Sequence, residues 1–358
     1  MNQRLSGFNW RLNFTWLLLL ALGLITLNTL DQEFFFQQLL NALVGLGFFF
    51  LFSQIDYHLY PRFKGWLFLG TLVFLLSTFV FGAVTRGSIR WINVLGLTLQ
   101  PSELSKPLLV LFFASFLAER ELNLKNLSKA GVLILLPVVL VFLQPDLGSS
   151  LVVFFAWAGM VLGAGLATKI VLVSLVGLLA GLPLGWRLLQ PYQQQRIASF
   201  LNPLADPLGA GYNLIQTVVA VGAGQFWGRG LGKGTQAQLM FLPERHSDFI
   251  FATIAEEFGF LGGLVMFFLI ALLLWQILNV AQNAKDRLGF LLGLGIFASL
   301  ASQTLINLGM NLGMLPITGI TLPLVSYGGS SLVATMIFLG IVNNLSQQRK
   351  KPPAIEIR

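Results

Sequence analysis

The sequence predicts an all-α integral membrane protein with about ten transmembrane helices, organised as a single polytopic domain over residues 1–358. Three observations support this fold class: hydrophobic residues make up 56% of the chain, the mean hydropathy is +0.79, and only 10% of the residues are charged. A soluble domain of this length has too little interior to bury so much apolar surface. The chain contains no cysteine, so disulfides and thiolate metal sites are excluded.

The predicted spans are apolar runs that approach the length of about 20 residues needed to cross a bilayer. They cover residues 12–30, 34–53, 64–83, 103–118, 130–144, 150–167, 169–186, 249–280, 288–308 and 330–346. The first run has no small-residue cleavage site after it, which predicts an uncleaved membrane anchor. The longest connection is a large outer loop at about 187–248. We expect short amphipathic or re-entrant helices in it, because structureless loops of that length are uncommon.

The basic residues orient the chain in the membrane. Most of the 22 Lys and Arg residues fall on the side that holds both chain ends, which identifies that side as cytoplasmic. This bias accounts for much of the net charge of +8, and no nucleic-acid partner is expected. Some basic residues remain in or beside the outer loops: Arg86, Arg90, Lys106, Arg187, Arg196, Arg229, Lys233 and Arg245. Individual members can simply decorate long loops, but as a set they predict a surface for a lipid phosphate or pyrophosphate.

The outer segment 84–106 is unusually polar for this chain. Pro101 followed by Ser102 is typical of a helix start, which places Glu103 and Lys106 about one turn apart on one helix face. Two interpretations of this pair remain open. It is either a structural ion pair that makes a buried span tolerable, or a pair that positions or neutralises a substrate group.

A glycine-rich run at 222–234 lies within the large outer loop, with Arg229 and Lys233 between its glycines. Glycine lets backbone N–H groups approach a phosphate closely, so the run is compatible with a phosphate site. It does not match the P-loop, because no Ser or Thr follows the lysine. Flexible turns are the alternative interpretation.

Residues 244–257 concentrate charge where the span at 249–280 begins. Arg245, His246 and Asp248 are expected at its outer mouth, with Glu256 and Glu257 in the next turns. Because charge is scarce in this chain, the cluster predicts chemistry on a substrate that resides in the membrane. His58 falls on the opposite side of the membrane from His246, which excludes a metal site built on a histidine pair.

The last outer segment, 316–331, contains Ser326 and Tyr327 among prolines and glycines. Irregular backbone at membrane depth must be buried in protein or line a cavity. This segment is therefore predicted to form a cavity wall.

Several motifs occur in a distinctive order along the chain. They are Arg90-Trp91, Gln100-Pro101-Ser102-Glu103 with Lys106, Gln144-Pro145-Asp146-Leu147-Gly148, Asn202-Pro203, Leu242-Pro243-Glu244 with His246-Ser247-Asp248, Glu256-Glu257 with Gly259, and Ser326-Tyr327-Gly328-Gly329-Ser330. Together they resemble the SEDS family (shape, elongation, division and sporulation), which includes RodA and FtsW. The resemblance extends from about residue 86 to 346. Gly234-Thr235-Gln236 and Arg245 are closer to RodA, whereas Asn202-Pro203 and Ser330-Ser331 resemble FtsW; RodA is favoured.

The resemblance implies a peptidoglycan glycosyltransferase in the bacterial cytoplasmic membrane, with its active site facing outward. Such enzymes polymerise lipid II into β-1,4-linked glycan strands, and undecaprenyl pyrophosphate leaves with inversion at the sugar. The matching aspartate, Asp248, is implied as the catalytic residue, acting as the general base on the acceptor hydroxyl.

The resemblance also implies the substrate-binding residues, cofactor and partners. Substrate-binding roles are expected for Arg90, Trp91, Glu103, Lys106, Arg196, Arg245, His246, Ser326 and Tyr327. The basic members would stabilise negative charge on the pyrophosphate, together with a divalent cation, Mg²⁺ or Mn²⁺, for which Asp248 is a candidate ligand. The expected partners are lipid II, membrane lipids and a class B penicillin-binding protein, which is a transpeptidase.

Two other functions remain open from the sequence. A lipid II flippase would use the same charges and the same lipid, but the chain shows no inverted repeat with paired broken helices, the usual indication of a transporter. A scaffold that only recruits a wall-building partner would not need Asp248. Replacing Asp248 separates the three: a polymerase loses bond formation, a flippase loses transbilayer movement, and a scaffold is unaffected.

Overall fold

The computed structural model describes residues 9–85, 88–94, 97–166, 170, 181, 186–187 and 189–348. Within this part of the chain, eight helices are long and apolar enough to cross a membrane. They are α1 (Trp10–Leu30), α2 (Gln32–Gln54), α3 (Tyr60–Phe81, after the 3-10 turn η1, Tyr57–Leu59), α4 (Pro101–Ala118), α5 (Leu124–Leu143), α11 (Ile250–Gln282), α12 (Arg287–Asn311) and α13 (Gly329–Gln347).

The predicted spans agree with these helices. Each span outside 169–186 coincides with one of them or with α6 (Leu147–Gly163), an apolar helix of 17 residues. The span predicted at 169–186 lies almost entirely outside the described residues, so the total of ten stays a prediction. The chain is a multi-pass membrane protein.

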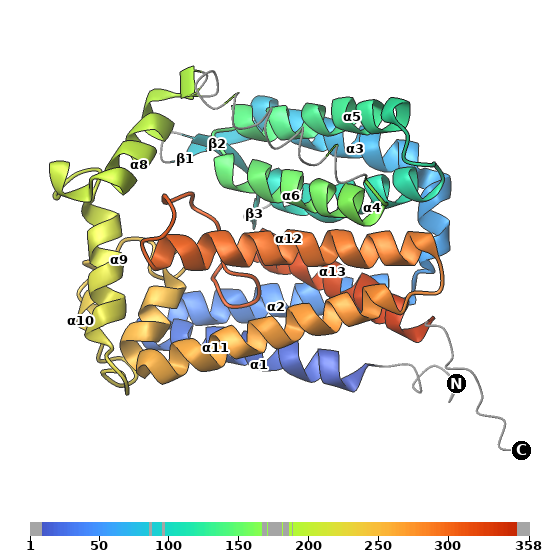
Figure 1. Ribbon diagram of the computed structural model, residues 1–358. Coiled ribbons are helices and arrows are strands. Elements are labelled where there is room, and N and C mark those ends of the chain that lie inside the picture. The colour runs from blue at the N-terminus through green and yellow to red at the C-terminus, as the bar shows by residue number, and fades with distance from the viewer. Residues whose placement is uncertain are drawn as a thin grey trace, which may run out of the picture.

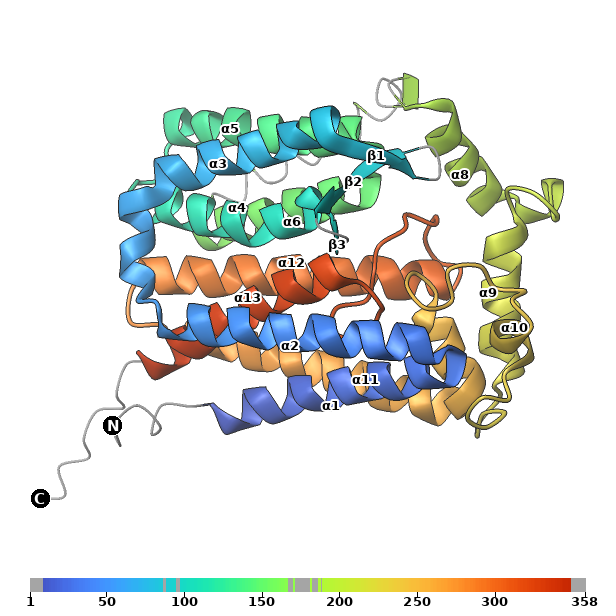
Figure 2. The same ribbon diagram turned by 180° about the vertical axis from the view of Figure 1, so that it is seen from behind.

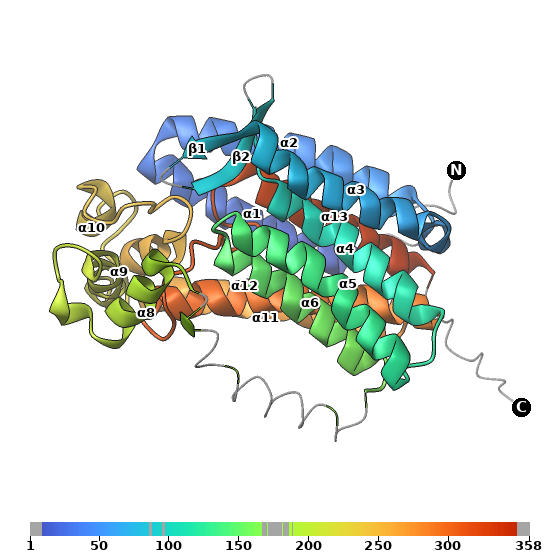
Figure 3. The same cartoon turned by 90° about the horizontal axis from the view of Figure 1, so that it is seen from above.

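The helices run roughly along one common axis, and the shorter elements gather at one end of the bundle (Figures 1 and 2). At this end, which we call the loop end, lie α8 (Pro191–Leu201), η2 (Pro203–Ala205), α9 (Tyr212–Ala223) and α10 (Thr235–Gln238). Viewed from above, α8, α9 and α10 cluster beyond the ends of the long helices (Figure 3). Helix α11 begins at the loop end, whereas α1 begins and α13 ends at the opposite end.

A small antiparallel sheet, which was not predicted, interrupts the helical architecture in the polar segment 84–106. Its strands β1 (Gly82–Thr85), β2 (Ser88–Val94) and β3 (Leu97–Leu99) pair in the order β1-β2-β3. The register pairs Ile92 with Gly82 on one side and with Leu99 on the other. Strands this short carry little periodic signal in the sequence, which explains why polarity alone predicted a loop. The sheet lies at the loop end and carries Arg90 and Trp91 on β2.

The interior of the bundle is formed by α4, α12 and α13, which are largely buried, while only a small share of α2, α3 and α5 is buried. Packing around α12 is tight at Gly295, where an added Cβ would lie 2.7 Å from the sulfur of Met160 on α6. Close contacts of this kind are typical of helices that associate within a membrane. Helix α13 packs along α2, which brings together segments nearly three hundred residues apart in the sequence.

Helix α11 is kinked at Gly259, whose φ of +69° and ψ of −165° lie in a region that only glycine adopts readily. An added Cβ there would lie 2.2 Å from the amide nitrogen of Gly228 and 2.6 Å from the carbonyl oxygen of Phe226. This approach lets the N–H of Phe260 donate to the carbonyl of Gln225, at 2.8 Å. The kink therefore fixes the segment after α9 against α11.

We expect Gly259→Ala to lower the stability of the protein, because the new side chain imposes both backbone strain and a clash with Gly228. The strain alone costs about 1–3 kcal/mol. The measurement is thermal unfolding of the detergent-purified protein. Gly263→Ala is the matched control in the same helix, since its Cβ would make ordinary contact with Phe251 at 3.8 Å. Equal unfolding temperatures for the two variants would contradict the close approach.

Candidate active site

Asp248 lies in the turn that leads into α11 and is half-buried. Side chains from other elements hold this turn by hydrogen bonds to its backbone carbonyls. The side-chain amides of Asn307 and Asn311 on α12 both donate to the carbonyl oxygen of Asp248, at 3.0 and 2.9 Å. The hydroxyl of Ser326 donates to the carbonyl of Ser247 at 2.6 Å. The backbone position of Asp248 is thus set by elements far away in the sequence.

The segment between α12 and α13 supplies the second half of this support. The N–H of Tyr327 donates to the carbonyl of His246 at 2.9 Å, and the N–H of Leu322 donates to the Ser326 hydroxyl at 2.7 Å. The amide of Gln38 on α2 donates to the carbonyl of Ser326 at 3.0 Å. The predicted cavity-wall segment therefore packs directly on the turn that carries Asp248.

His246 and Tyr327 belong to an aromatic cluster against the start of α2. The imidazole of His246 stacks on Phe34 with ring centroids 4.1 Å apart, and the ring of Tyr327 lies 5.2 Å from Phe34. The Tyr327 hydroxyl donates to Gln37. These contacts place both predicted substrate-binding residues beside Asp248, and they also pack the turn against α2.

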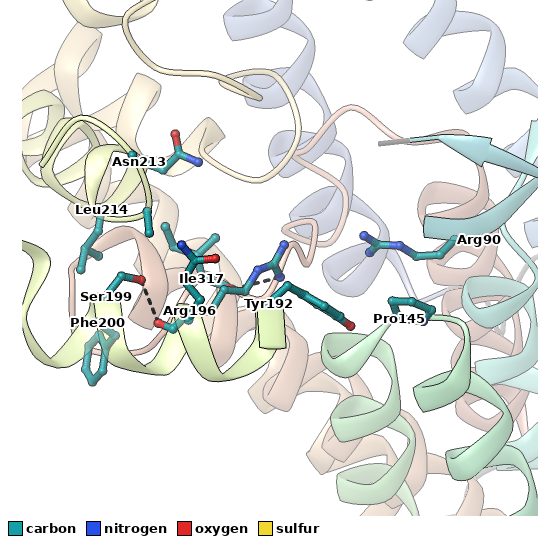
Figure 4. Close-up of a pocket in the computed structure, with 12 residues that line it drawn as sticks. Arg90, Pro145, Tyr192, Arg196, Ser199, Phe200, Asn213, Leu214 and Ile317 are labelled. Carbon is teal, nitrogen blue, oxygen red and sulfur yellow. Dashed lines mark hydrogen bonds between the residues drawn. The ribbon is translucent and has the colours of Figure 1, made fainter. Parts of the chain in front are cut away.

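A cavity of about 460 Å³ opens at the loop end between β2, α8, α9 and the turn before α6. Its wall includes Arg90, Tyr192, Arg196, Asn213 and Ile317 (Figure 4). Arg90 and Arg196 approach it from opposite sides, with Tyr192 between them. Two of the predicted anion-binding residues are therefore brought together, from a strand and a helix about a hundred residues apart in sequence.

The charges around this cavity act on one another. Burial and the positive charge of Arg90 lower the pKa of the Arg196 guanidinium, while Tyr192 and the carboxylates of Asp248 and Asp146 oppose that shift. Arg196 also donates to the carbonyl of Ile317 at 3.2 Å. Two residues further along, a Cβ on Gly319 would lie 3.4 Å from a carboxylate oxygen of Asp248. The segment 317–319 thus contacts Arg196 at Ile317 and approaches the carboxylate of Asp248 at Gly319.

The remaining predicted residues lie elsewhere. Glu103 and Lys106 form a buried ion pair at 2.7 Å, and Lys106 donates to Gln303 on α12 at 2.9 Å; neither lines the cavity. Trp91, beside Arg90 on β2, is half-buried and also outside the cavity lining. Burial lowers the pKa of Arg245, and the carboxylate of Asp31 between α1 and α2 opposes the shift. Arg245 therefore acts on the α1–α2 turn, away from Arg196.

The glycine-rich run at 222–234 wraps two carboxylates of the chain itself. The N–H groups of Gln236 and Ala237 donate to Glu256 at 2.9 and 3.1 Å. The N–H of Gly232 donates to Glu257 at 3.0 Å, and the Thr29 hydroxyl does so at 2.8 Å. Buried carboxylates need such donors. Within the run, the N–H of Gly232 is used by the Glu257 carboxylate, and those of Arg229 and Gly230 donate to the backbone carbonyls of Glu256 and Glu257. These contacts favour the turn interpretation of the run over a phosphate site.

Several structural residues at the site were not predicted. Asp146 caps α6 through Ser149 and accepts hydrogen bonds from Gln100 at 2.9 Å and Ser102 at 2.8 Å. Its sequence signal is an acidic residue directly before a helix. Asn307 and Asn311 carry only a weak sequence signal: with Gln303 they place three amides four residues apart on one face of a largely apolar helix.

No group of three or more His, Cys, Asp or Glu side chains is placed to hold a metal ion among the residues that the structure describes. A cation at this site would therefore need ligands from a bound substrate in addition to Asp248.

Comparison with known proteins places the chain among membrane proteins of cell-wall synthesis. The family model FTSW_RODA_SPOVE, described as "Cell cycle protein", matches residues 10–351. Peptidoglycan glycosyltransferase MrdB of Escherichia coli is 39% identical over 311 residues, which are 86% of this chain and 84% of that protein. Stage V sporulation protein E of Bacillus subtilis is 36% identical over 349 residues, which are 92% and 94% of the two chains.

Solved structures share the fold. A chain from a study of "Structural coordination of polymerization and crosslinking by a peptidoglycan synthase complex" superposes with a TM-score of 0.85 at 32% identity, covering 96% of this chain and 99% of that one. The crystal structure of the rod shape determining protein RodA of Thermus thermophilus gives a TM-score of 0.72 at 30% identity, covering 96% and 98%.

We expect Glu256→Gln to destabilise the protein, because glutamine offers one acceptor oxygen where Gln236 and Ala237 need two. Losing a buried hydrogen bond to a charged group costs about 1.5–3 kcal/mol. Thermal unfolding measures the change, and Glu121→Gln, which alters an exposed carboxylate, is the control. A variant as stable as wild type would show that the loop does not depend on Glu256.

Proposed function

The chain belongs to the FtsW/RodA/SpoVE family, in which it is closer to RodA, and we propose that it polymerises lipid II into glycan strands. It is a peptidoglycan glycosyltransferase, as its curated relatives are named. The observation that carries the proposal is the position of Asp248 beside a cavity whose wall contains Arg90 and Arg196.

The proposed reaction is a single displacement. The 4-hydroxyl oxygen of the acceptor sugar attacks the anomeric carbon of the donor, and the bond from that carbon to the pyrophosphate oxygen breaks. The hydroxyl proton passes to the carboxylate of Asp248, and the electron pair of the broken bond leaves with undecaprenyl pyrophosphate. A carboxylate in the turn before α11 suits this role, because it can accept the hydroxyl proton in the transition state.

Arg90 and Arg196 are proposed to bind the pyrophosphate of the donor. Negative charge grows on that group as the bond breaks, and cations held in a partly buried wall stabilise it more strongly than water does. The lowering of the Arg196 pKa by the positive charge of Arg90 supports this role, because a bound anion would relieve this repulsion. Arg245 interacts electrostatically with Asp31 in the α1–α2 turn, and its proposed role is to stabilise the turn that carries Asp248.

The described residues could hold a divalent cation only if the bound substrate supplied some of its ligands. Mg²⁺ is commonly bound by one or two carboxylates together with substrate phosphates. Asp248 is proposed as the carboxylate that would hold it, because it approaches the segment that lines the cavity with Arg90 and Arg196. When bound, the ion would supply positive charge near the leaving group.

The proposed setting is the cytoplasmic membrane, with the loop end facing outward. The positive-inside rule supports this orientation, because most of the Lys and Arg residues fall in the segments at the end opposite the loop end. A class B penicillin-binding protein is proposed as partner. One structural neighbour comes from a complex described as coordinating polymerisation and crosslinking, which supports such a pairing.

We expect Asp248→Asn to abolish glycan polymerisation from purified lipid II while leaving thermal stability near wild type. A general base contributes about 10²–10⁴-fold to rate, and asparagine cannot accept the proton. Product length on gels measures the outcome, with partner transpeptidase and Mg²⁺ or Mn²⁺ present. Glu33→Gln, an exposed carboxylate at the start of α2, is the matched control and retains polymerisation.

Full polymerisation by the Asp248→Asn protein would remove Asp248 from the mechanism. Wild-type protein that is folded and partner-bound, yet makes no glycan while moving lipid II across vesicle membranes, would support the flippase function instead.

We expect Arg196→Gln to lower kcat/KM for lipid II about 10- to 100-fold, since a charge-assisted contact is worth about 1.5–3 kcal/mol. Initial polymerisation rates over a range of lipid II concentrations measure it. Arg187→Gln removes an exposed arginine that does not line the cavity, and this control should change little. Equal losses in both variants would indicate a general charge effect rather than a pyrophosphate site.

A further inference from the structure

The first turn of α11 lacks a conventional cap. The initial N–H groups of a helix have no partner within the helix, and an Asp, Asn or Ser at the cap position usually supplies one. Here the cap position is Phe249, which cannot accept a hydrogen bond, and α11 has no side-chain cap from its own N-cap residue. Asp248 precedes it directly and has the side chain that favours capping.

Helix α12 supplies the missing acceptor. The side-chain oxygen of Asn311 accepts from the N–H of Ala252, the third residue of α11, at 3.2 Å. The same amide donates to the carbonyl oxygen of Asp248 at 2.9 Å. Asn311 is fully buried, with 0% exposure. The Asn311 side chain therefore satisfies a backbone acceptor just before α11, the Asp248 carbonyl, and a backbone donor in its first turn, the Ala252 N–H.

Asn307, one turn earlier on α12, completes the arrangement. Its amide donates to the carbonyl of Asp248 at 3.0 Å and to the carbonyl of Ile320 at 2.7 Å. It is also fully buried. Because Ile320 follows Gly319, whose Cβ position lies 3.4 Å from the Asp248 carboxylate, Asn307 ties Asp248 to the segment that contacts Arg196 at Ile317.

We propose that Asn311 and Asn307 are positioning residues for glycan polymerisation: both fix the main chain of Asp248, and Asn311 also caps α11 from a neighbouring helix, so together they set where the Asp248 carboxylate stands. The proposal rests on the proposed role of Asp248. Both amides hold the main chain of Asp248, and neither lines the cavity. They therefore act on the rate of the chemical step through Asp248, with no contact to the substrate.

The test is the steady-state kinetics of Asn311→Ala with purified lipid II. Without the amide, the N–H of Ala252 loses its acceptor and the carbonyl of Asp248 loses one of its two amide donors, so the turn can shift. We expect kcat to fall about 10- to 100-fold, the size of effect that a misplacement of about 1 Å produces. KM should stay near wild type, because the cavity wall is unchanged. Asn307→Ala removes the other amide that donates to the Asp248 carbonyl and leaves the Asn311 cap on α11 intact. It should show the same pattern.

The matched control is Asn344→Ala on α13, a buried amide that donates to the carbonyl of Ser53 at 2.9 Å near the opposite end of the bundle. It removes the same group and should lower thermal stability to a similar degree, with kcat unchanged. Asn311→Ser keeps a hydroxyl that can accept and donate, so it should recover part of kcat and remain folded if the alanine variant does not.

The outcomes separate this inference from the proposed function. If Asp248→Asn is inactive while Asn311→Ala and Asn311→Ser keep wild-type kcat, only the positioning role is overturned. If kcat falls equally in Asn311→Ala and Asn344→Ala, the amide contributes stability alone and the inference also fails. If Asp248→Asn polymerises normally, the proposed base fails, and the positioning role fails with it.

Discussion

The structure depends on one constraint, which is that irregular backbone at membrane depth must find its hydrogen-bond partners inside the protein. The turn at 243–249 and the segment at 312–328 are both irregular, and they meet this requirement largely through each other and through α12. Tyr327 bonds to His246, Ser326 bonds to Ser247, and Asn307 bonds to Ile320. The pair can therefore exist only as a unit. This unit places a carboxylate next to a charged cavity without a regular element to carry it.

A second consequence concerns the few charges of the chain. Most buried charged groups near the loop end are bound internally: Glu103 by Lys106, Asp146 by Gln100 and Ser102, and Glu256 and Glu257 by backbone N–H groups. These groups support the architecture. Arg90 and Arg196 lie on the cavity wall instead, and the charges of Arg90 and Asp248 both act on Arg196, so a substrate in the cavity would meet these charges together. The division explains how a chain with 10% charged residues concentrates reactivity in one place.

The sequence was most informative where a signal is local. The span predicted at 288–308 corresponds to α12 at Arg287–Asn311, and Glu103 and Lys106 form the pair that their spacing indicated. Signals that depend on tertiary partners were ambiguous. The glycines of 222–234 suit a phosphate and an internal carboxylate equally well, and only the fold brings Glu256 to them. Arg196 and Arg245 are both outer arginines in sequence, yet α8 brings one to the cavity while the other acts on the α1–α2 turn. Asn311 shows its role only when α11 is beside it.

The packing of α13 along α2 has a consequence for the order in which the protein matures during synthesis. Gln37 and Gln38 are made early, but their partners Tyr327, Ser326 and Gly328 are made nearly three hundred residues later. The first helices therefore wait in the membrane with incomplete contacts until the last one is inserted, and domains with such distant pairings form late. A chain interrupted before α13 can hold Asp248 but lacks the support of its turn. The hydrogen bonds that hold the Asp248 turn against α2 are therefore complete only in the full-length chain.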